Sequence, residues 1–180
     1  MTRKLVSALF LVAAMLVALP QAGSASARST DPHWGPALYQ NKHSGRCLGV
    51  QGPSQSDGAL ILQWGCNTWD PNSDHRWFLE PVPGSPGFFI IFNGRSGKCL
   101  AVPGGTHAPN TQLIQWPCDA RIRDHRWRFQ QYADGRYQII NYHTGQCVAV
   151  RDAKLGDGAE VIQWPCGDHP DHFWAVVPWS

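Results

Sequence analysis

The chain contains Gly97-Lys98-Cys99, Gln115-Trp116-Pro117-Cys118 and Asp124-His125-Arg126-Trp127, a set of three segments that occurs three times in related form. This repeat indicates the fold. In the first copy the matching segments are Gly45-Arg46-Cys47, Gln63-Trp64-Gly65-Cys66 and Asp74-His75-Arg76-Trp77. In the third copy they are Gly145-Gln146-Cys147, Gln163-Trp164-Pro165-Cys166 and Asp171-His172-Phe173-Trp174. A unit of about 50 residues cannot bury its apolar face alone, so such repeats share one core. We predict one domain over residues 37–180, with repeats at about 37–86, 87–135 and 136–180.

Residues 1–27 have the pattern of a secretory signal peptide. Arg3 and Lys4 form a basic start, Leu5–Leu19 is apolar, and Ala25-Ser26-Ala27 is a small-residue cleavage pattern. The apolar stretch is short for a membrane span, and small polar residues follow it. We therefore expect a secreted, extracellular protein without membrane insertion.

The mature chain would begin near Arg28, with residues 28–36 as an N-terminal tether. Arg3 and Lys4 are two of the 15 basic residues, so the rest of the chain has 13 basic and 13 acidic residues. A net charge near zero provides no attraction for nucleic acid or an anionic membrane surface. We therefore expect neither as a partner.

All six cysteines lie in the predicted mature chain, and an even number in an exported protein indicates disulfides. Each copy has two cysteines at the same spacing, so we predict one bridge within each copy: Cys47–Cys66, Cys99–Cys118 and Cys147–Cys166. Each bridge closes a loop of about 20 residues and is worth about 3 kcal/mol in the chain-entropy model. A zinc site would need short Cys-x-x-Cys pairs, which the sequence lacks. We expect no metal and no cofactor.

Short strand-like runs separated by turn residues fill each copy. In the second copy these runs are residues 88–93, 99–102, 112–116 and 127–130. Gly, Pro, Asn and Asp bound the runs, which is typical of strands, and no mature segment has sustained helical periodicity. Four runs per copy predict an all-β body of about twelve short strands that closes on itself and so protects its sheet edges.

These features resemble the ricin B-type β-trefoil lectins, which also occur as carbohydrate-binding modules. The resemblance covers residues 37–180 and rests on Gly-Lys-Cys-Leu-Ala-Val (97–102), Leu-Ile-Gln-Trp-Pro-Cys (113–118) and the Trp that closes each copy. In the family that Trp ends a Gln-x-Trp motif, and this chain has histidine in place of the Gln: His75, His125 and His172. The resemblance implies a β-trefoil with one sugar site per copy, formed by an acid, a stacking aromatic and a polar residue.

Two of these three parts are present in every copy. The family's acid follows Cys-Leu, and the residues at that position here have no carboxylate: Gly49, Ala101 and Ala149. The stacking aromatic is Trp64, Trp116 and Trp164. The polar position, often Asn in the family, is Asp74, Asp124 and Asp171. We predict that each Trp stacks on the apolar face of a sugar ring while each Asp accepts its hydroxyls.

The same residue types also have structural uses. The three Trp side chains could pack under a loop, since alternation separates Trp64 from Gln63 without showing which face is outward. The three Asp residues could cap turn backbone N–H groups. The histidines, and with them Gln63, Gln115 and Gln163, are predicted to brace loops by hydrogen bonding.

We predict a secreted, stand-alone, non-catalytic carbohydrate-binding protein, a monomer with up to three weak sugar sites and glycans as partners. The sequence has no Gly-x-Ser-x-Gly motif and no Gly-rich phosphate loop, and its acids lie mostly in predicted turns. The alternative is a β-trefoil protein-interaction module, such as an inhibitor or a toxin-associated subunit, that has lost sugar binding.

Overall fold

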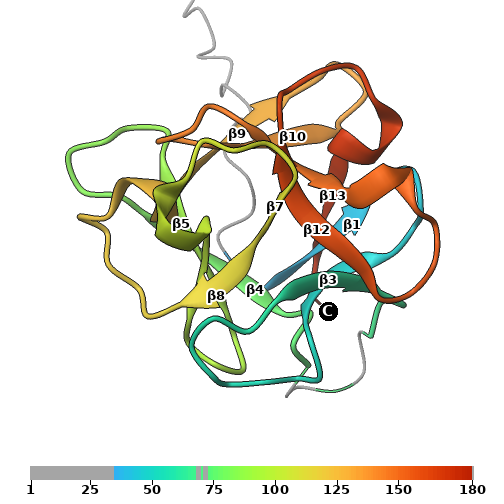
Figure 1. The fold of residues 1–180 in the computed structure, drawn as a ribbon, viewed down its shortest axis with the longest axis horizontal. Coiled ribbons are helices and arrows are strands. Elements are labelled where there is room, and N and C mark those ends of the chain that lie inside the picture. The colour runs from blue at the N-terminus through green and yellow to red at the C-terminus, as the bar shows by residue number, and fades with distance from the viewer. Residues whose placement is uncertain (1–34, 68–69, 71–72, 180) are drawn as a thin grey trace, which may run out of the picture.

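The computed structural model describes residues 35–67, 70 and 73–179, which contain strands and short 3₁₀ turns but no α-helix (Figure 1). In this part of the chain thirteen strands make up the sheet, so the predicted all-β class is confirmed. The predicted signal peptide (1–27) and most of the predicted tether (28–36) lie outside the described residues. Within the described ranges, no helix has the length and apolar character needed to cross a membrane.

The first and last strands of the three repeats form a closed six-stranded barrel. These strands are β1 (Ala37–Asn41), β4 (Trp77–Pro81), β5 (Phe89–Asn93), β9 (Arg126–Gln131), β10 (Tyr137–Asn141) and β13 (Trp174–Pro178). Each pairs antiparallel with the next one around the ring, and β13 pairs with β1 to close it. Closure gives every barrel strand two neighbours, which removes exposed sheet edges.

Three hairpins cap one end of the barrel. They are β2 (Cys47–Val50) with β3 (Ile61–Trp64), β6 (Cys99–Ala101) with β8 (Ile114–Trp116), and β11 (Cys147–Val150) with β12 (Ala159–Trp164). β12 pairs with β3 and also with the short strand β7 (Thr111–Gln112), and a bridge joins Leu60 to Ile114. In Figure 1, β3, β7, β8 and β12 surround the centre of this cap. The barrel and the cap together form the predicted β-trefoil.

The count of thirteen strands exceeds the predicted twelve because the third strand of repeat two is split. Leu113 lies between β7 and β8 and is fully buried. Its N–H donates to the Val161 carbonyl oxygen, and its own carbonyl oxygen accepts from the Ile61 N–H, both at 2.9 Å. Leu113 therefore joins all three hairpins at the centre of the cap, where regular pairing with one strand is interrupted.

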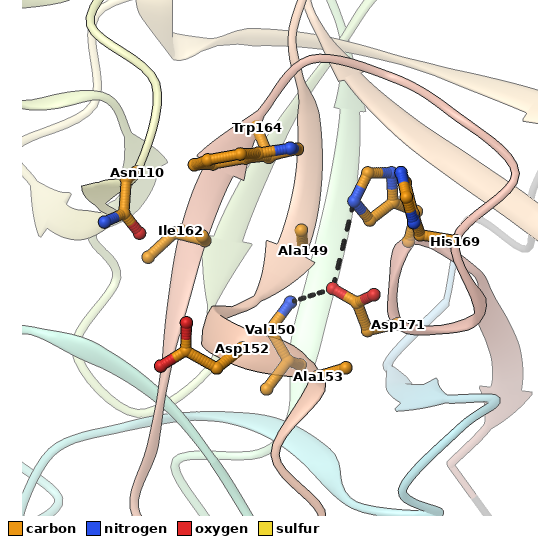
Figure 2. A pocket seen from close by; sticks show the side chains of 10 residues that line it. Asn110, Ala149, Val150, Asp152, Ala153, Ile162, Trp164, His169 and Asp171 are labelled. Carbon is orange, nitrogen blue, oxygen red and sulfur yellow. Dashed lines mark hydrogen bonds and ion pairs between the residues drawn. The ribbon is translucent and has the colours of Figure 1, made fainter.

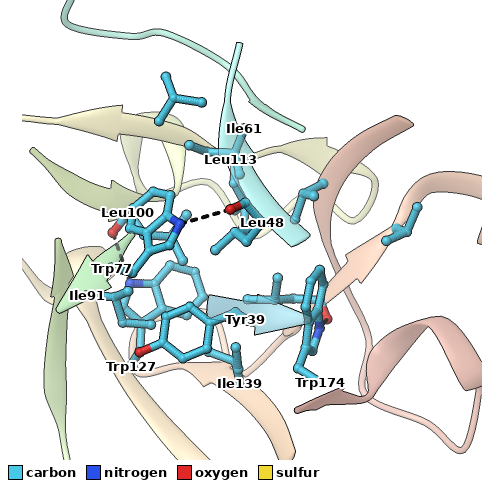
Figure 3. Close-up of a cluster of buried hydrophobic side chains, with 14 of the residues drawn as sticks. Tyr39, Leu48, Ile61, Trp77, Ile91, Leu100, Leu113, Trp127, Ile139 and Trp174 are labelled. Atoms are coloured by element: carbon cyan, nitrogen blue, oxygen red, sulfur yellow. Dashed lines mark hydrogen bonds between the residues drawn. The ribbon is translucent and has the colours of Figure 1, made fainter. Parts of the chain in front are cut away.

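The tryptophan that closes each repeat lies in the shared core with no exposed surface (Figure 3). Each indole N–H donates to a carbonyl oxygen of the second strand in its own repeat, at 2.9–3.0 Å. These donor–acceptor pairs are Trp77–Leu48, Trp127–Leu100 and Trp174–Val148. Because the buried N–H is paired, the large apolar ring is buried without the cost of an unsatisfied donor.

The three predicted disulfides are confirmed, and each lies within one repeat. Cys47–Cys66, Cys99–Cys118 and Cys147–Cys166 each span 19 residues and each have a Cα–Cα distance of 5.0 Å. Each bridge ties the start of a cap hairpin to the loop that follows the exposed Trp. The bridges therefore hold the loops beside the candidate sites.

Candidate functional site

The cross-strand register of the cap hairpins decides which residues face outward. In repeat one, Cys47 pairs with Trp64 and Gly49 with Leu62, while Leu48 pairs with Gln63, and the other repeats have the same register. Paired residues share a face of the hairpin, so the indole lies beside the family's acid position and opposite the glutamine. The indole face is the outer one, since Trp64, Trp116 and Trp164 are 51%, 43% and 38% exposed and the three glutamines are fully buried.

Each exposed indole lines a hollow, and there is one such hollow in each repeat. The hollows have volumes of about 760, 360 and 270 Å³ in repeats one, two and three. All three contain the same four positions, namely the acid position of the family, the exposed Trp, the Asp and the His that follows it. In repeat order these are Gly49, Trp64, Asp74 and His75; Ala101, Trp116, Asp124 and His125; and Ala149, Trp164, Asp171 and His172. Figure 2 shows the hollow of repeat three.

The three carboxylates line the hollows, and two of them, Asp74 and Asp171, also accept a hydrogen bond from the backbone. Asp74 Oδ2 accepts from the Val50 N–H at 2.8 Å, and Asp171 Oδ2 accepts from the Val150 N–H at 3.2 Å. The Asp side chains remain 15%, 14% and 9% exposed in repeat order. A carboxylate has about four lone-pair positions, so one backbone bond leaves capacity for a ligand hydroxyl. Turn bracing and ligand contact are therefore compatible uses of these residues.

Each histidine is buried beside the Asp that precedes it. The Nε2 atoms of His75, His125 and His172 lie 3.8–3.9 Å from the neighbouring carboxylate oxygens. Nδ1 of His75 accepts from the Asn67 N–H, and Nδ1 of His125 accepts from the Asp119 N–H, which leaves the ring proton on Nε2 facing the carboxylate. Burial lowers the pKa of all three histidines below the usual value, although the adjacent carboxylate opposes this shift. The neutral rings of His75 and His125 therefore brace their loops at neutral pH.

In repeat one the Asp–His pair fills the space of the missing acid. A Cβ atom built on Gly49 would lie 2.4 Å from His75 Cδ2 and 2.8 Å from Asp74 Oδ2. The Asp74 carboxylate therefore reaches the place beside Trp64 where the resemblance implies an acid on the strand. Ala101 and Ala149 carry the Cβ that Gly49 lacks, and they too line hollows that contain the Asp–His pair.

A loop from a neighbouring repeat lies against each exposed indole. Gly158 of repeat three, if given a Cβ, would meet the Trp64 ring at 3.3 Å, and Gly58 of repeat one would meet the Trp116 ring at 3.7 Å. For Trp164 of repeat three the corresponding loop residue is Asn110 of repeat two, which lines the same hollow. The hollows of repeats one and three therefore each include a residue from another repeat, Gly158 and Asn110, whereas the residues that line the hollow of repeat two all belong to that repeat.

The buried glutamines connect each hairpin to that neighbouring loop. Gln115 Nε2 donates to the carbonyl oxygens of Ser54 and Ser56 at 2.9 and 3.0 Å, and its Oε1 accepts from the Ser96 hydroxyl at 2.7 Å. Gln63 and Gln163 make the equivalent three contacts, each accepting from a hydroxyl of its own repeat and donating to a loop of another repeat, 154–156 and 106–108 respectively. The glutamine side chains thus hold the loops that lie against the indoles.

Three asparagines that the sequence interpretation did not single out hold the Asp–His loops in place. Each lies at the end of the first strand of a repeat, is almost fully buried, and donates to the backbone carbonyl of the Asp in the preceding repeat. The donor–acceptor pairs are Asn41–Asp171, Asn93–Asp74 and Asn141–Asp124. A sequence signal existed, because Asn precedes the Gly of Gly-x-Cys by four residues in every copy.

The cluster of Asp and His at residues 168–172 does not assemble a metal site. Within residues 35–67, 70 and 73–179, no group of three or more His, Cys, Asp or Glu side chains could hold a metal ion. The rings of His169 and His172 pack on each other with centroids 5.1 Å apart, and Asp171 lies beside His172. These groups belong to the hollow of repeat three.

Solved structures show the same fold in proteins of different kinds. The designed threefold-symmetric protein ThreeFoil is similar with a TM-score of 0.73 and 28% identity, over 79% of this chain and 98% of ThreeFoil. An exo-β-1,3-galactanase from Clostridium thermocellum is similar with a TM-score of 0.74 and 29% identity, over 82% of this chain. The match spans only 31% of the galactanase chain. A lectin from Polyporus squamosus has a TM-score of 0.68 at 18% identity, over 82% of this chain and 50% of the lectin, which shows the fold alone.

Sequence comparison identifies the family. No curated protein sequence is significantly similar to the chain. A family model described as ricin-type beta-trefoil lectin domain-like matches residues 37–116, 73–164 and 123–180. Because these overlapping matches span the whole described barrel and its cap, the chain belongs to the ricin-type β-trefoil lectin domain-like family.

Proposed function

We propose that the protein is a secreted, non-catalytic carbohydrate-binding protein with one sugar site in the hollow of each repeat. The observation that carries this proposal is the threefold recurrence of an exposed indole beside a carboxylate in a surface hollow. A tryptophan kept 38–51% exposed in all three repeats does not contribute its full area to the core. Binding an apolar surface accounts for that arrangement.

The chemistry of a sugar ring fits these residues. One face of a pyranose carries C–H groups that stack on an indole, and its edge carries hydroxyls that donate to a carboxylate. Charge-assisted hydrogen bonds of this kind are about twice as strong as neutral ones. In each repeat, Asp74, Asp124 or Asp171 would accept hydroxyls in place of the acid that Gly49, Ala101 and Ala149 lack. The neutral histidine would keep the loop and its carboxylate in position.

Three sites on one rigid barrel suit a polymeric ligand. A hollow with one indole and one carboxylate offers few contacts, so we infer weak affinity per site. When a polysaccharide chain occupies one site, the other two sites meet its sugar units at a high effective concentration, which can raise overall affinity about a hundredfold or more. The solved structures support glycans as partners, since they include a lectin bound to a sialylated oligosaccharide and an earthworm lectin in complex with GalNAc.

Retention on insoluble polysaccharides tests the proposal. We expect the protein to be pulled down by at least one polysaccharide of a panel, and Trp116→Ala to reduce retention because it removes one stacking surface. The triple variant of Trp64, Trp116 and Trp164 to Ala should not be retained. Leu155→Ala is the matched control, since Leu155 is 55% exposed and lines none of the three hollows.

Absence of sugar binding together with capture of a protein favours the alternative function, a protein-interaction module. If a folded protein binds no polysaccharide in the panel and no glycan on an array, but captures a defined protein partner, it is a protein-interaction module. Structures of a mosquitocidal holotoxin and a cytolethal distending toxin share the fold at 10% and 17% identity, so a toxin-associated subunit is the form that this alternative takes.

Export and oligomeric state are separate parts of the proposal. The three disulfides and the family favour an extracellular location. We infer that the exported chain begins near Arg28 and is a monomer. Mass spectrometry of the secreted protein and light scattering check these two points independently of sugar binding.

A further inference from the structure

We propose that the hollow of repeat three is the principal site, and that Asp152 and Asn110 are its specificity-determining residues for an uncharged glycan. This inference rests on the proposed function and deepens it. Asp152 and Asn110 have no counterpart in the other two repeats, and they supply the polar edge that the family's missing acid would otherwise provide. Four observations support this assignment.

The first observation is the turn after the second strand of each repeat. In repeat one this turn is Gln51-Gly52-Pro53, in repeat two Pro103-Gly104-Gly105, and in repeat three Arg151-Asp152-Ala153. The middle residue has a φ of 59°, 61° and 55° in repeat order. Glycine adopts this left-handed conformation at no steric cost, whereas other residues pay for it, Asn and Asp less than the rest. Repeat three alone places a carboxylate at this position.

The second observation is that repeat three tolerates strain to do so. Asp152 and the following Ala153, with a φ of 50°, are both non-glycine residues in the left-handed region. Such strained residues concentrate at functional sites, where another role maintains them. Glycine at Gly104 and Gly105 shows that the same turn can be built without this strain. The Asp152 side chain is 72% exposed and lines the hollow, so packing does not explain its presence.

The third observation is a matching replacement on the loop from repeat two. Asn110 has a φ of 63°, while the equivalent residues of the other loops are Gly58 and Gly158, at 74° and 78°. The Asn110 backbone is fixed on both sides, because its N–H donates to Gln163 O at 2.9 Å and its carbonyl oxygen accepts from Arg151 Nη2 at 3.1 Å. Asn110 lines the hollow, and its side-chain amide carries a donor and an acceptor.

The fourth observation is the layout of the hollow (Figure 2). The Trp164 indole forms one wall, Asn110 and Asp152 lie on one side, and Asp171 and His169 lie on the other. A sugar ring stacked on Trp164 would therefore meet acceptors along two edges. The hollows of repeats one and two have a carboxylate on one side only, from Asp74 or Asp124.

The charges around this hollow select against acidic sugars. No Lys or Arg is among the described residues that line it, and it contains two carboxylates. The nearest basic side chains have acidic partners, since Lys154 Nζ lies 3.6 Å from Asp152 Oδ2 and Arg151 pairs with Glu160. A uronate or a sialic acid would bring a third negative charge, and the adjacent Lys154 and Arg151 already pair with Asp152 and Glu160. Neutral hydroxyls lack this penalty, so the ligand is an uncharged glycan.

The test isolates repeat three by using the full chain with Trp64→Ala and Trp116→Ala as the parent protein. Affinity electrophoresis with soluble galactan, xylan and glucan, and with polygalacturonate as the acidic polymer, measures binding. We expect the parent to bind a neutral polymer and not polygalacturonate. Asp152→Gly and Asn110→Gly should each weaken binding, by about tenfold for the carboxylate. Both should unfold at the same or a higher temperature, because glycine relieves the positive φ.

The outcomes separate the two proposals. If Trp164→Ala in this parent leaves binding unchanged, or if the wild-type protein binds no polymer, sugar binding in the hollows is wrong. If the wild type binds a polymer and the parent does not, repeat three is not the principal site. If Trp164→Ala abolishes binding but Asp152→Gly and Asn110→Gly bind as the parent does, the assignment of these two residues is wrong and the proposed function stands. Binding of polygalacturonate at the level of the neutral polymers would overturn the selection for uncharged glycans. Glycine variants that lose binding but keep their stability support the inference.

Discussion

At the scale of single residues, a buried histidine stands where the family has glutamine, and this choice makes stability depend on pH. His75, His125 and His172 are 2–4% exposed, and burial lowers their pKa. In the unfolded chain each would bind a proton near pH 6.5. Between that value and the lower pKa of the folded state, only the unfolded chain is protonated. The free energy of unfolding is therefore complete above about pH 6.5 and decreases as the pH falls toward the folded pKa.

We predict that His125→Gln reduces this acid sensitivity. Glutamine can supply the donor and acceptor of the neutral ring but takes up no proton. Urea denaturation at pH 7 and pH 5 measures the change, and the variant should lose less stability than the wild type over that interval. His43→Gln is the control, since His43 is exposed. Equal losses in wild type and His125→Gln would contradict a buried, neutral His125.

At the scale of elements, the cap hairpins are linked through side chains rather than by strand pairing alone. Gln115 is fully buried in β8, yet its amide reaches two carbonyl oxygens on a loop of repeat one. An ion pair of 2.6 Å between Lys98 and Asp57 joins the same two repeats. The loop that these groups hold ends at Gly58, against the Trp116 indole. Loss of the link should therefore affect both stability and the neighbouring site.

We predict that Gln115→Met destabilises the protein by about 1–3 kcal/mol, because two carbonyl oxygens and the Ser96 hydroxyl lose their partner. Amide exchange of residues 54–58 should accelerate more than that of the barrel strands. Gln55→Met is the matched control, because Gln55 lies exposed on the same loop. If amide exchange of residues 54–58 accelerates no more than that of the barrel strands in either variant, Gln115 does not hold the loop.

At the scale of the whole molecule, three repeats share one barrel and one core, and each adds a covalent loop of equal length. We predict that replacing any one cysteine pair with alanine lowers the free energy of unfolding by about 3 kcal/mol, by a similar amount in each repeat. Thermal or denaturant unfolding of the three double variants measures this. A much larger loss for one pair would show that its bridge holds more than its own loop. Variants with a single Cys replaced serve as controls for mispairing.

Much of the fold could be predicted from the repeat. The recurrence of Gly-x-Cys, Gln-Trp-x-Cys and the closing Trp predicts three units, a shared core and one bridge per unit, and all of these are present. Residues 88–93, 99–102, 112–116 and 127–130 match β5 to β9 to within a residue or two, apart from the break at Leu113. That break depends on hydrogen bonds to Val161 and Ile61 in other repeats, which no local pattern encodes.

The candidate sites were only partly predictable. Alternation in Leu60-Ile61-Leu62-Gln63-Trp64 separates Trp64 from Gln63, but only the packing of the barrel decides that the indole is outside. The roles of Asn93 and of the loop around Asn110 depend on contacts between repeats. A single repeat carries no information about such contacts until the three are placed around a common axis.

The architecture follows from the repeated pattern alone, because a covalent repeat with local cysteine pairs and strand-length apolar runs has few ways to bury its apolar surface. The positions of the sites and the differences between them follow from the packing of the repeats against one another. The hollows of repeats one and three combine a hairpin and its following loop with a loop residue of another repeat, Gly158 or Asn110, so their contents depend on three-dimensional neighbours. For the same reason the repeats, alike in sequence, are unequal at Asp152 and Asn110, where left-handed backbone carries side chains instead of glycine.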